Sequence, residues 1–276
     1  MRYFCPTDEA EALQLRGRLG RGALPLAGGT DLMVSARAAG WPDSLVSLRR
    51  LGWDGITLGD DAVHIGAMTT ASVIARDLRD AVPLLASAAS WLGGPQVRNR
   101  ATVGGNLCTA SPAADMVLSL LVLDAQVELV SACGVRRLRV REFVIGPKQT
   151  AIGDDELLRA VIVPRPPPNS RPWFRKVGPR SRHFISRVAV AGLLTVFDEG
   201  CALRLGLGAV APTPIRAVRA ERFIADTGRL GDAEIAEAAR LAAAECSPVD
   251  DIRASAEYRR AVVKVLVTRF LHEGAP

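Results

Sequence analysis

The sequence predicts an α+β protein of two domains, the second of them a small sheet covered by helices. In the first part of the chain, strand-like and helix-like segments alternate without the regular βαβ repeat of a doubly wound sheet. A segment with five prolines in ten residues, 163–172, then interrupts the chain. Three strand-like segments and two amphipathic helical segments follow it, which is an order typical of an α+β fold.

The first part contains several short elements in turn. A strand at 23–27 leads to a helix that we expect to start at Thr30 as N-cap and to stop at Gly40. The helix at 82–94 has Pro83 in its first turn and ends at two glycines. Period-two patterns predict the remaining strands, which are 43–48, 63–67, and a hairpin of 126–130 with 135–140.

The proline-rich segment marks the domain boundary. Proline fixes the backbone and removes an N–H donor, so such a stretch is extended and continues neither a helix nor a central strand. We therefore expect domains at 1–168 and 171–276. In the second, strands are expected at 173–177, 186–197 and 201–210, and helices at 232–245 and 255–273, the last burying Tyr258, Val262, Val265 and Leu266.

Composition excludes several function classes. The chain has 276 residues and 49% of them are hydrophobic, so a sizeable core can form, but the longest apolar runs span ten residues and are too short to cross a bilayer. No apolar signal core follows the first residues, so we expect a cytoplasmic protein without a membrane span. The net charge is +6, yet the arginines are scattered and aromatic residues are only 5%, so no nucleic-acid partner is expected.

The cysteines and histidines do not form a metal-binding pattern. The five cysteines lie far apart in sequence, with no C-x-x-C pair and no zinc or iron–sulfur spacing, and the three histidines do not pair with them. We therefore expect reduced thiols and no bound metal. No acid–base pair or nucleophile stands out, so no catalytic residue is assigned.

Two glycine pairs carry the main functional signal. Gly28-Gly29 follow a strand, and Gly104-Gly105 come shortly before an apolar run for which Ser111 suits the N-cap and Pro112 the first helical position. Glycine lets main-chain amides approach a ligand, and a helix N-terminus attracts phosphate. Two such loops can hold the two phosphates of a dinucleotide. Ordinary tight turns remain the alternative, because neither loop is G-x-G-x-x-G or a Walker loop.

Together, "AGGTDL" and "TVGGNLCTASPAAD" resemble the flavin-binding subunit of the molybdenum hydroxylases, the family of xanthine dehydrogenase and aerobic carbon monoxide dehydrogenase. "FRKVGPRSRHFISRVAVA", "GAVAPTPIRA" and "RASAEYRRAVVKVLVTR" are similar to its later landmarks, in the same order. The resemblance covers almost the whole chain. It implies a PCMH-type FAD-binding domain of two α/β subdomains, followed by a small antiparallel sheet with packed helices.

The resemblance also implies which residues contact FAD. Main-chain amides and hydroxyls near the glycine pairs would hold the diphosphate, and later positions would contact the adenine, the FAD hydroxyls and the flavin ring. The implied contacts are Leu26, Ala27, Gly28, Gly29, Thr30, Asp31, Leu32, Met33, Leu92, Thr102, Gly104, Gly105, Asn106, Thr109, Ser111, Asp115, Leu158 and Lys176.

Several of these residues have a second reading. Ser111 caps a helix or donates to the cofactor, and Asp115 is an acid in a first helical turn or a partner of FAD hydroxyls. Lys176 is a solvated strand lysine or a cation beside the flavin ring, where it would favour the anionic reduced form. Leu92 cannot stack on adenine as an aromatic ring would. Leu158 would contact the flavin through its backbone.

The implied function is electron transfer. In this family a small [2Fe-2S] subunit and a large molybdopterin subunit complete a heterotrimer or a dimer of heterotrimers. Electrons would pass from their clusters through FAD to NAD⁺, oxygen or another acceptor. Two alternatives are a self-contained FAD-dependent oxidase or dehydrogenase acting on a small organic substrate, and a non-enzymatic protein that has kept only the fold.

Overall fold

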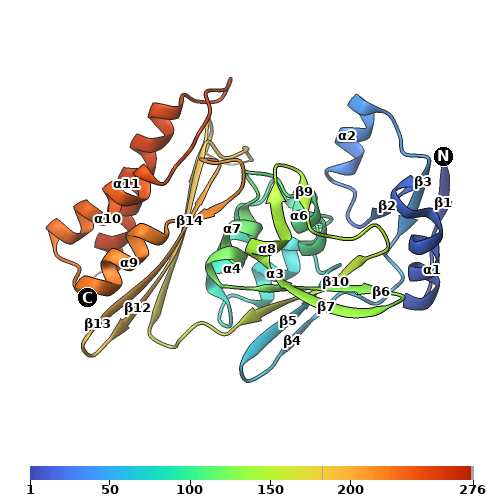
Figure 1. The fold of residues 1–276 in the computed structure, drawn as a ribbon, viewed down its shortest axis with the longest axis horizontal. Coiled ribbons are helices and arrows are strands. Elements are labelled where there is room, and N and C mark those ends of the chain that lie inside the picture. Colours follow the sequence, from blue (N-terminus) through green and yellow to red (C-terminus); the bar gives the residue numbers. More distant parts are fainter. Residues whose placement is uncertain (182, 275–276) are drawn as a thin grey trace.

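The computed structural model describes residues 1–181 and 183–274. The chain begins with a small parallel sheet of three strands in the order β1-β3-β2, packed against helix α1 (Figure 1). Its elements are β1 (Arg2–Phe4), α1 (Glu9–Leu19), a 3-10 turn (Gly20–Gly22), β2 (Ala23–Leu26), α2 (Leu32–Ala39) and β3 (Ser44–Ser47). Helix α2 stands at the margin of this unit, because only Ala36 among its residues is buried.

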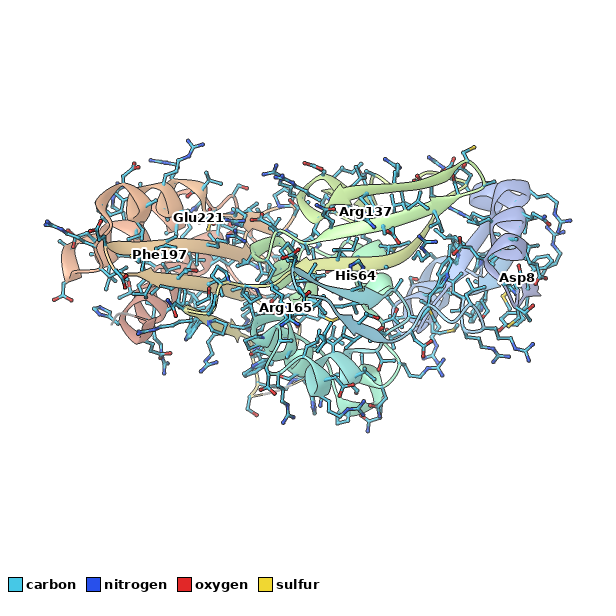
Figure 2. The ribbon with its side chains drawn as sticks, turned by 90° about the horizontal axis from the view of Figure 1, so that it is seen from below. Asp8, His64, Arg137, Arg165, Phe197 and Glu221 are labelled. Atoms are coloured by element: carbon cyan, nitrogen blue, oxygen red, sulfur yellow. The ribbon has the colours of Figure 1, made fainter. Side chains whose placement is uncertain are left out.

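A five-stranded antiparallel sheet in the order β4-β5-β10-β6-β7 forms the second unit. Helices cover one of its faces, while His64 and Arg137 lie over the other face, which Figure 2 shows from below. The strands are β4 (Ile56–Leu58), β5 (Ala62–Gly66), β6 (Gln126–Ser131), β7 (Gly134–Arg139) and β10 (Leu157–Pro164). The helices and small strands are α3 (Ala71–Asp77), α4 (Pro83–Trp91), α5 (Pro95–Arg98), α6 (Val103–Thr109), α7 (Asp115–Val122), α8 (Val140–Phe143), β8 (Val144–Gly146) and β9 (Gln149–Thr150).

The third unit is a four-stranded antiparallel sheet with three helices on one face (Figure 1). It consists of β11 (Ser170–Val177), β12 (Val188–Phe197), β13 (Gly200–Gly208), β14 (Ile215–Arg216), α9 (Val218–Thr227), α10 (Asp232–Ala244) and α11 (Ala256–Gly274). The predicted α+β fold is therefore confirmed.

The two larger sheets share α4 and α7, which lie between them. The main hydrophobic core accordingly includes residues of the five-stranded unit together with Phe174, Ala191 and Leu193 from the third unit. On its other face the four-stranded sheet forms a second core with α9, α10 and α11. Burial of apolar surface on both faces of the four-stranded sheet stabilises its position against the rest of the chain.

The part of the proline-rich segment that lies outside the strands is shorter than its composition suggested, because β10 ends at Pro164 and β11 begins at Ser170. Pro164 is the last residue of β10, a central strand, and Pro172 lies within β11. The expectation that this segment continues no central strand was wrong at Pro164, whereas Pro172 lies in an edge strand and agrees with it. Proline at a strand end or on an edge strand removes no essential ladder bond, and β11 is an edge strand.

The buried stripe of the last helix also differs from the prediction. Val263, Val267 and Phe270 face the core, whereas Tyr258 and Val265 are 40% and 65% exposed. Helix α11 is apolar on more than one side, so periodicity alone did not identify the side that packs. The ring of Phe270 stacks on Trp173 with centroids 5.5 Å apart, and this contact fixes the inward face.

Candidate functional site

The two glycine loops lie next to each other. Gly28 packs so closely on the turn between α5 and α6 that a methyl group there would overlap the carbonyl oxygen of Arg100. A methyl group on Gly105 would lie 3.7 Å from Cβ of Ala27. The fold thus brings together two segments that are about seventy residues apart in sequence, as binding of one diphosphate by both loops requires.

The first loop offers unpaired main-chain donors. Among the described residues, the amides of 28–32 donate no hydrogen bond within the protein. Gly29 has φ +75°, a left-handed conformation that favours glycine and turns the chain sharply. Asp31 precedes the first residue of α2 without a side-chain cap, so the expected N-cap role of Thr30 was wrong. The free amides and the N-terminus of α2 are therefore suited to bind an anion.

The second loop is different, because its amides are already used. Thr102 is the N-cap of α6, and its hydroxyl accepts a hydrogen bond from the amide of Gly105 at 3.1 Å. The amides of Val103 and Gly104 donate to the carbonyls of Thr69 and Ala67 at 3.0 and 2.9 Å. Gly104 and Gly105 thus lie inside the first turn of a helix rather than ahead of one. Gly104 packs on the backbone of Ala67, where an added methyl group would lie 2.8 Å from the carbonyl oxygen, so a larger residue there would disturb this loop.

Asn106 supplies a polar atom without a partner, which the amides of this second loop do not offer. Its side-chain oxygen is buried, and among the described residues no donor reaches it. A buried acceptor without a partner costs about 1–3 kcal/mol, so such atoms mark places where a ligand or water completes the structure. Asn106 and Thr109 share one face of α6, three residues apart.

Ser111 does not cap a helix, which corrects the prediction. Its hydroxyl accepts from the amide of Ala113 at 3.3 Å within a turn, and α7 begins only at Asp115 with Ala114 as N-cap. The carboxylate at the start of α7 takes part in a tertiary contact.

That contact joins two predicted site residues to each other. Nζ of Lys176 donates to Oδ2 of Asp115 at 2.6 Å, and the two residues are 7% and 6% exposed. Ser186 donates to the other carboxylate oxygen at 3.2 Å. Lys176 also lies 5.1 Å from the ring centroid of Phe184. Burial raises the pKa of Asp115, and the ion pair with Lys176 and the Ser186 hydroxyl offset part of that rise.

Ser186 and Phe184 belong to the segment "FRKVGPRSRHFISRVAVA", in which the sequence assigned a role only to Lys176. Nothing in their spacing identifies them as neighbours of Asp115, which is seventy residues away. Leu158 is buried in β10 opposite Leu129 of β6, and α6 packs on β10. Leu92 ends α4, and its carbonyl accepts from Arg98 at 3.2 Å.

Comparison with known proteins decides the family. The family described as "FAD binding domain in molybdopterin dehydrogenase" matches residues 1–166, and "CO dehydrogenase flavoprotein C-terminal domain" matches residues 173–274. The chain belongs to the FAD-binding subunits of the molybdopterin dehydrogenases. This confirms the resemblance inferred from the glycine loops, and with it FAD as the cofactor of the family.

Relatives of this flavoprotein family extend over nearly the whole chain. The chain is 33% identical to the carbon monoxide dehydrogenase medium chain of Afipia carboxidovorans, with 97% of this chain and 94% of that one covered. It is 32% identical to the xanthine dehydrogenase FAD-binding subunit of Escherichia coli O157:H7, with 90% and 87% covered.

The fold of the family agrees as well. The structure of reconstituted CO dehydrogenase from Oligotropha carboxidovorans superimposes with a TM-score of 0.92 at 32% identity, covering 98% of this chain and 95% of that one. The protein is thus an oxidoreductase subunit with the fold of the family's medium chains. Across 1–181 and 183–274, no helix is long and apolar enough to span a membrane, and no three His, Cys, Asp or Glu side chains are grouped as metal ligands.

The residues present fit FAD. The unpaired amides of the first loop suit a diphosphate, and the unpaired oxygen of Asn106 suits a hydroxyl or amide donor. Asp115 and Lys176 lie at one end of α7, within the same core that packs α6 on β10.

Proposed function

We propose that this subunit holds FAD at the two glycine loops and passes electrons between partner subunits and a final acceptor. When bound, FAD supplies the redox chemistry that connects [2Fe-2S] clusters of a small subunit to NAD⁺, oxygen or another acceptor. A large molybdopterin subunit completes the complex, as a heterotrimer or a dimer of heterotrimers. Relatives named as medium chains and FAD-binding subunits support this proposal.

Each part of the chain has a defined task in this proposal. Domain 1–168 binds the cofactor, and domain 171–276 contributes Lys176. The amides of 28–32 bind the diphosphate, while Thr30, Asn106 and Thr109 add polar side-chain contacts. The remaining predicted contacts keep the roles given above. The observation that carries the proposal is the run of unpaired amides at the first loop, beside the unpaired oxygen of Asn106.

The location of the complex is part of the proposal. Cys5, Cys108, Cys133, Cys201 and Cys246 are all free thiols. Unpaired cysteines suit a reducing compartment, so we propose that the protein works in the cytoplasm.

Asn106→Ala tests the site without disturbing the fold. Loss of one hydrogen bond to the cofactor is expected to weaken FAD binding about tenfold, which corresponds to about 1.4 kcal/mol. The apoprotein should lose no stability, because the removed oxygen has no partner in it. Flavin fluorescence titration gives the Kd, and thermal unfolding of the apoprotein gives its Tm.

Asn169→Ala is the matched control, since Asn169 is exposed in the segment between β10 and β11. It should change neither quantity. Unchanged FAD affinity in Asn106→Ala would place the cofactor elsewhere. Steady turnover of a small organic substrate by the isolated chain would instead favour the self-contained oxidase or dehydrogenase.

A further inference from the structure

A pocket separate from the predicted FAD site lies where the two domains meet. Its volume is about 550 Å³, and its walls come from α7 and α8 on one side and from β14 and α9 on the other. None of the predicted FAD contacts lines it. One wall, Thr213 to Arg216, belongs to "GAVAPTPIRA", a sequence landmark to which the electron-transfer function assigns no task.

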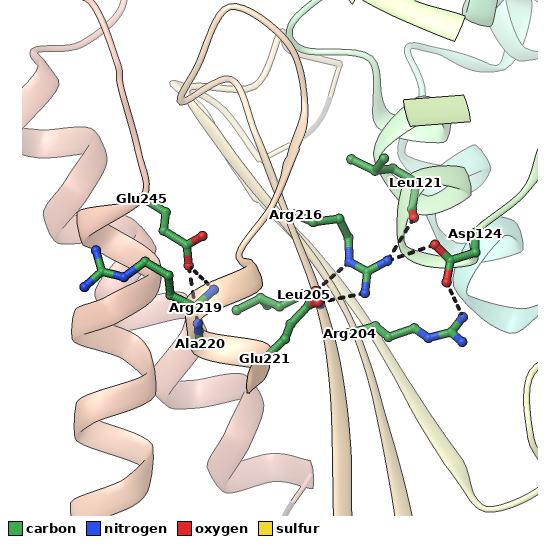
Figure 3. Close-up of polar contacts among 9 residues, drawn as sticks. All are labelled: Leu121, Asp124, Arg204, Leu205, Arg216, Arg219, Ala220, Glu221 and Glu245. Carbon is green, nitrogen blue, oxygen red and sulfur yellow. Dashed lines mark hydrogen bonds and ion pairs between the residues drawn. The ribbon is translucent and has the colours of Figure 1, made fainter. Parts of the chain in front are cut away.

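The acidic residues of this pocket are already neutralised. Asp124 accepts from Arg204 at 3.0 Å and from Arg216 at 3.1 Å (Figure 3). Glu221 accepts from Arg216 at 2.5 Å and from the amide of Leu205 at 2.7 Å. Because each carboxylate has an arginine partner, neither is free to bind a cationic ligand.

Two arginines at the rim of the pocket have no strong ion-pair partner. The guanidinium of Arg139 makes no ion pair or hydrogen bond within the described part of the chain. Arg141 faces its sequence neighbour Glu142 at 3.5 Å, and both side chains are at least half exposed, so that pair is weak. The electrostatic balance of the rim is therefore positive.

The lining of the pocket combines polar and apolar groups. Its apolar side chains include Leu121, Ile215 and Val218, and Val218 is 40% exposed. A pocket of this size lies within the range of small-molecule sites, which combine an apolar surface with a few polar groups that fix orientation. A bare inorganic anion would use only the arginines.

We propose that this pocket binds a small organic anion with an apolar body, such as a carboxylate with a hydrocarbon tail. The carboxylate lies between Arg139 and Arg141, whose planar guanidinium groups match its geometry. The tail lies against Leu121, Ile215 and Val218. Because the ligand contacts both domains, its binding stabilises their junction beside α7.

The test uses the purified full chain without FAD and three probes: octanoate, its neutral analogue octanamide, and inorganic phosphate. Calorimetric titration is expected to give saturable octanoate binding, at least about tenfold weaker binding of octanamide, and no saturable binding of phosphate. Equal binding of octanoate and octanamide would overturn the role of the arginines. Phosphate binding as strong as that of octanoate would overturn the role of the apolar surface.

Three variants locate the binding. The double variant Arg139→Gln/Arg141→Gln should weaken octanoate about tenfold or more, and Val218→Trp, at a rim position that is 40% exposed, should block the pocket. Arg37→Gln removes an exposed arginine of α2 and should leave octanoate binding unchanged. Wild-type affinity in the double variant or in Val218→Trp would refute the proposal. FAD titration of the same variants is expected to be normal, so failure here is distinct from failure of the proposed FAD site.

Discussion

Gly28→Ala is expected to abolish FAD binding and to lower the free energy of unfolding by about 3 kcal/mol, the upper end for an overpacked site. The new methyl group would overlap the carbonyl oxygen of Arg100, and backbone cannot move aside as a side chain can. Residues 100 and 101 lead directly into Thr102 and α6, so their displacement separates the two loops. Flavin content after reconstitution and denaturant unfolding measure the two effects.

Gly17→Ala provides the matched control. Gly17 lies inside α1, and no atom is within 4 Å of a methyl group placed there. Alanine in a helix interior should stabilise the protein by up to about 1 kcal/mol and leave FAD binding unchanged. Normal flavin content in Gly28→Ala would show that the contact with Arg100 does not shape the site.

Lys176→Met is expected to lower the free energy of unfolding by about 3–5 kcal/mol at neutral pH, because it leaves the buried carboxylate of Asp115 without its partner. The difference in free energy of unfolding between this variant and the wild type should become smaller as the pH falls. The pKa of Asp115 is raised in the folded state, so protonation of its carboxyl stabilises the folded protein at low pH. This stabilisation is lost as the pH rises through the folded-state pKa. Urea unfolding at several pH values measures the change.

The double variant Asp115→Leu/Lys176→Met completes the cycle. It removes both charges together, so its cost should be well below the sum of the two single variants. Lys264→Met is the control, because Lys264 is exposed on α11 and its replacement should change stability by less than about 0.5 kcal/mol. Additive costs would mean that the two side chains do not depend on each other.

Much of the fold could be predicted because many of its elements depend on local sequence patterns. Glycine pairs, capping residues and period-two strands depend on neighbours within a few positions. The hairpin at 126–139 and the strands β11, β12 and β13 accordingly formed close to where they were predicted, whereas the short edge strand β14 was not predicted. The family, too, could be inferred from the ordered motifs, since each is a continuous stretch of sequence.

The helix starts near the site could not be predicted in the same way. Ser111 and Thr30 are good N-cap residues, yet α7 and α2 begin later. Local capping contributes about 1 kcal/mol, which a tertiary contact can exceed. Asp115, the first residue of α7, pairs with Lys176, which lies 61 residues away in the sequence and so cannot be seen in a local pattern.

The sequence by itself determined the α+β class, several of the strands and helices, the two glycine pairs and the family of flavoproteins to which they belong. Only the tertiary structure decided which loop has free amides, that Asp115 of α7 pairs with Lys176 of β11, and that Tyr258 and Val265 lie outside the core. The physical reason is the range of the interactions. Backbone preference and periodicity act between near neighbours, whereas use of a donor and burial of a charge depend on residues that only folding brings together.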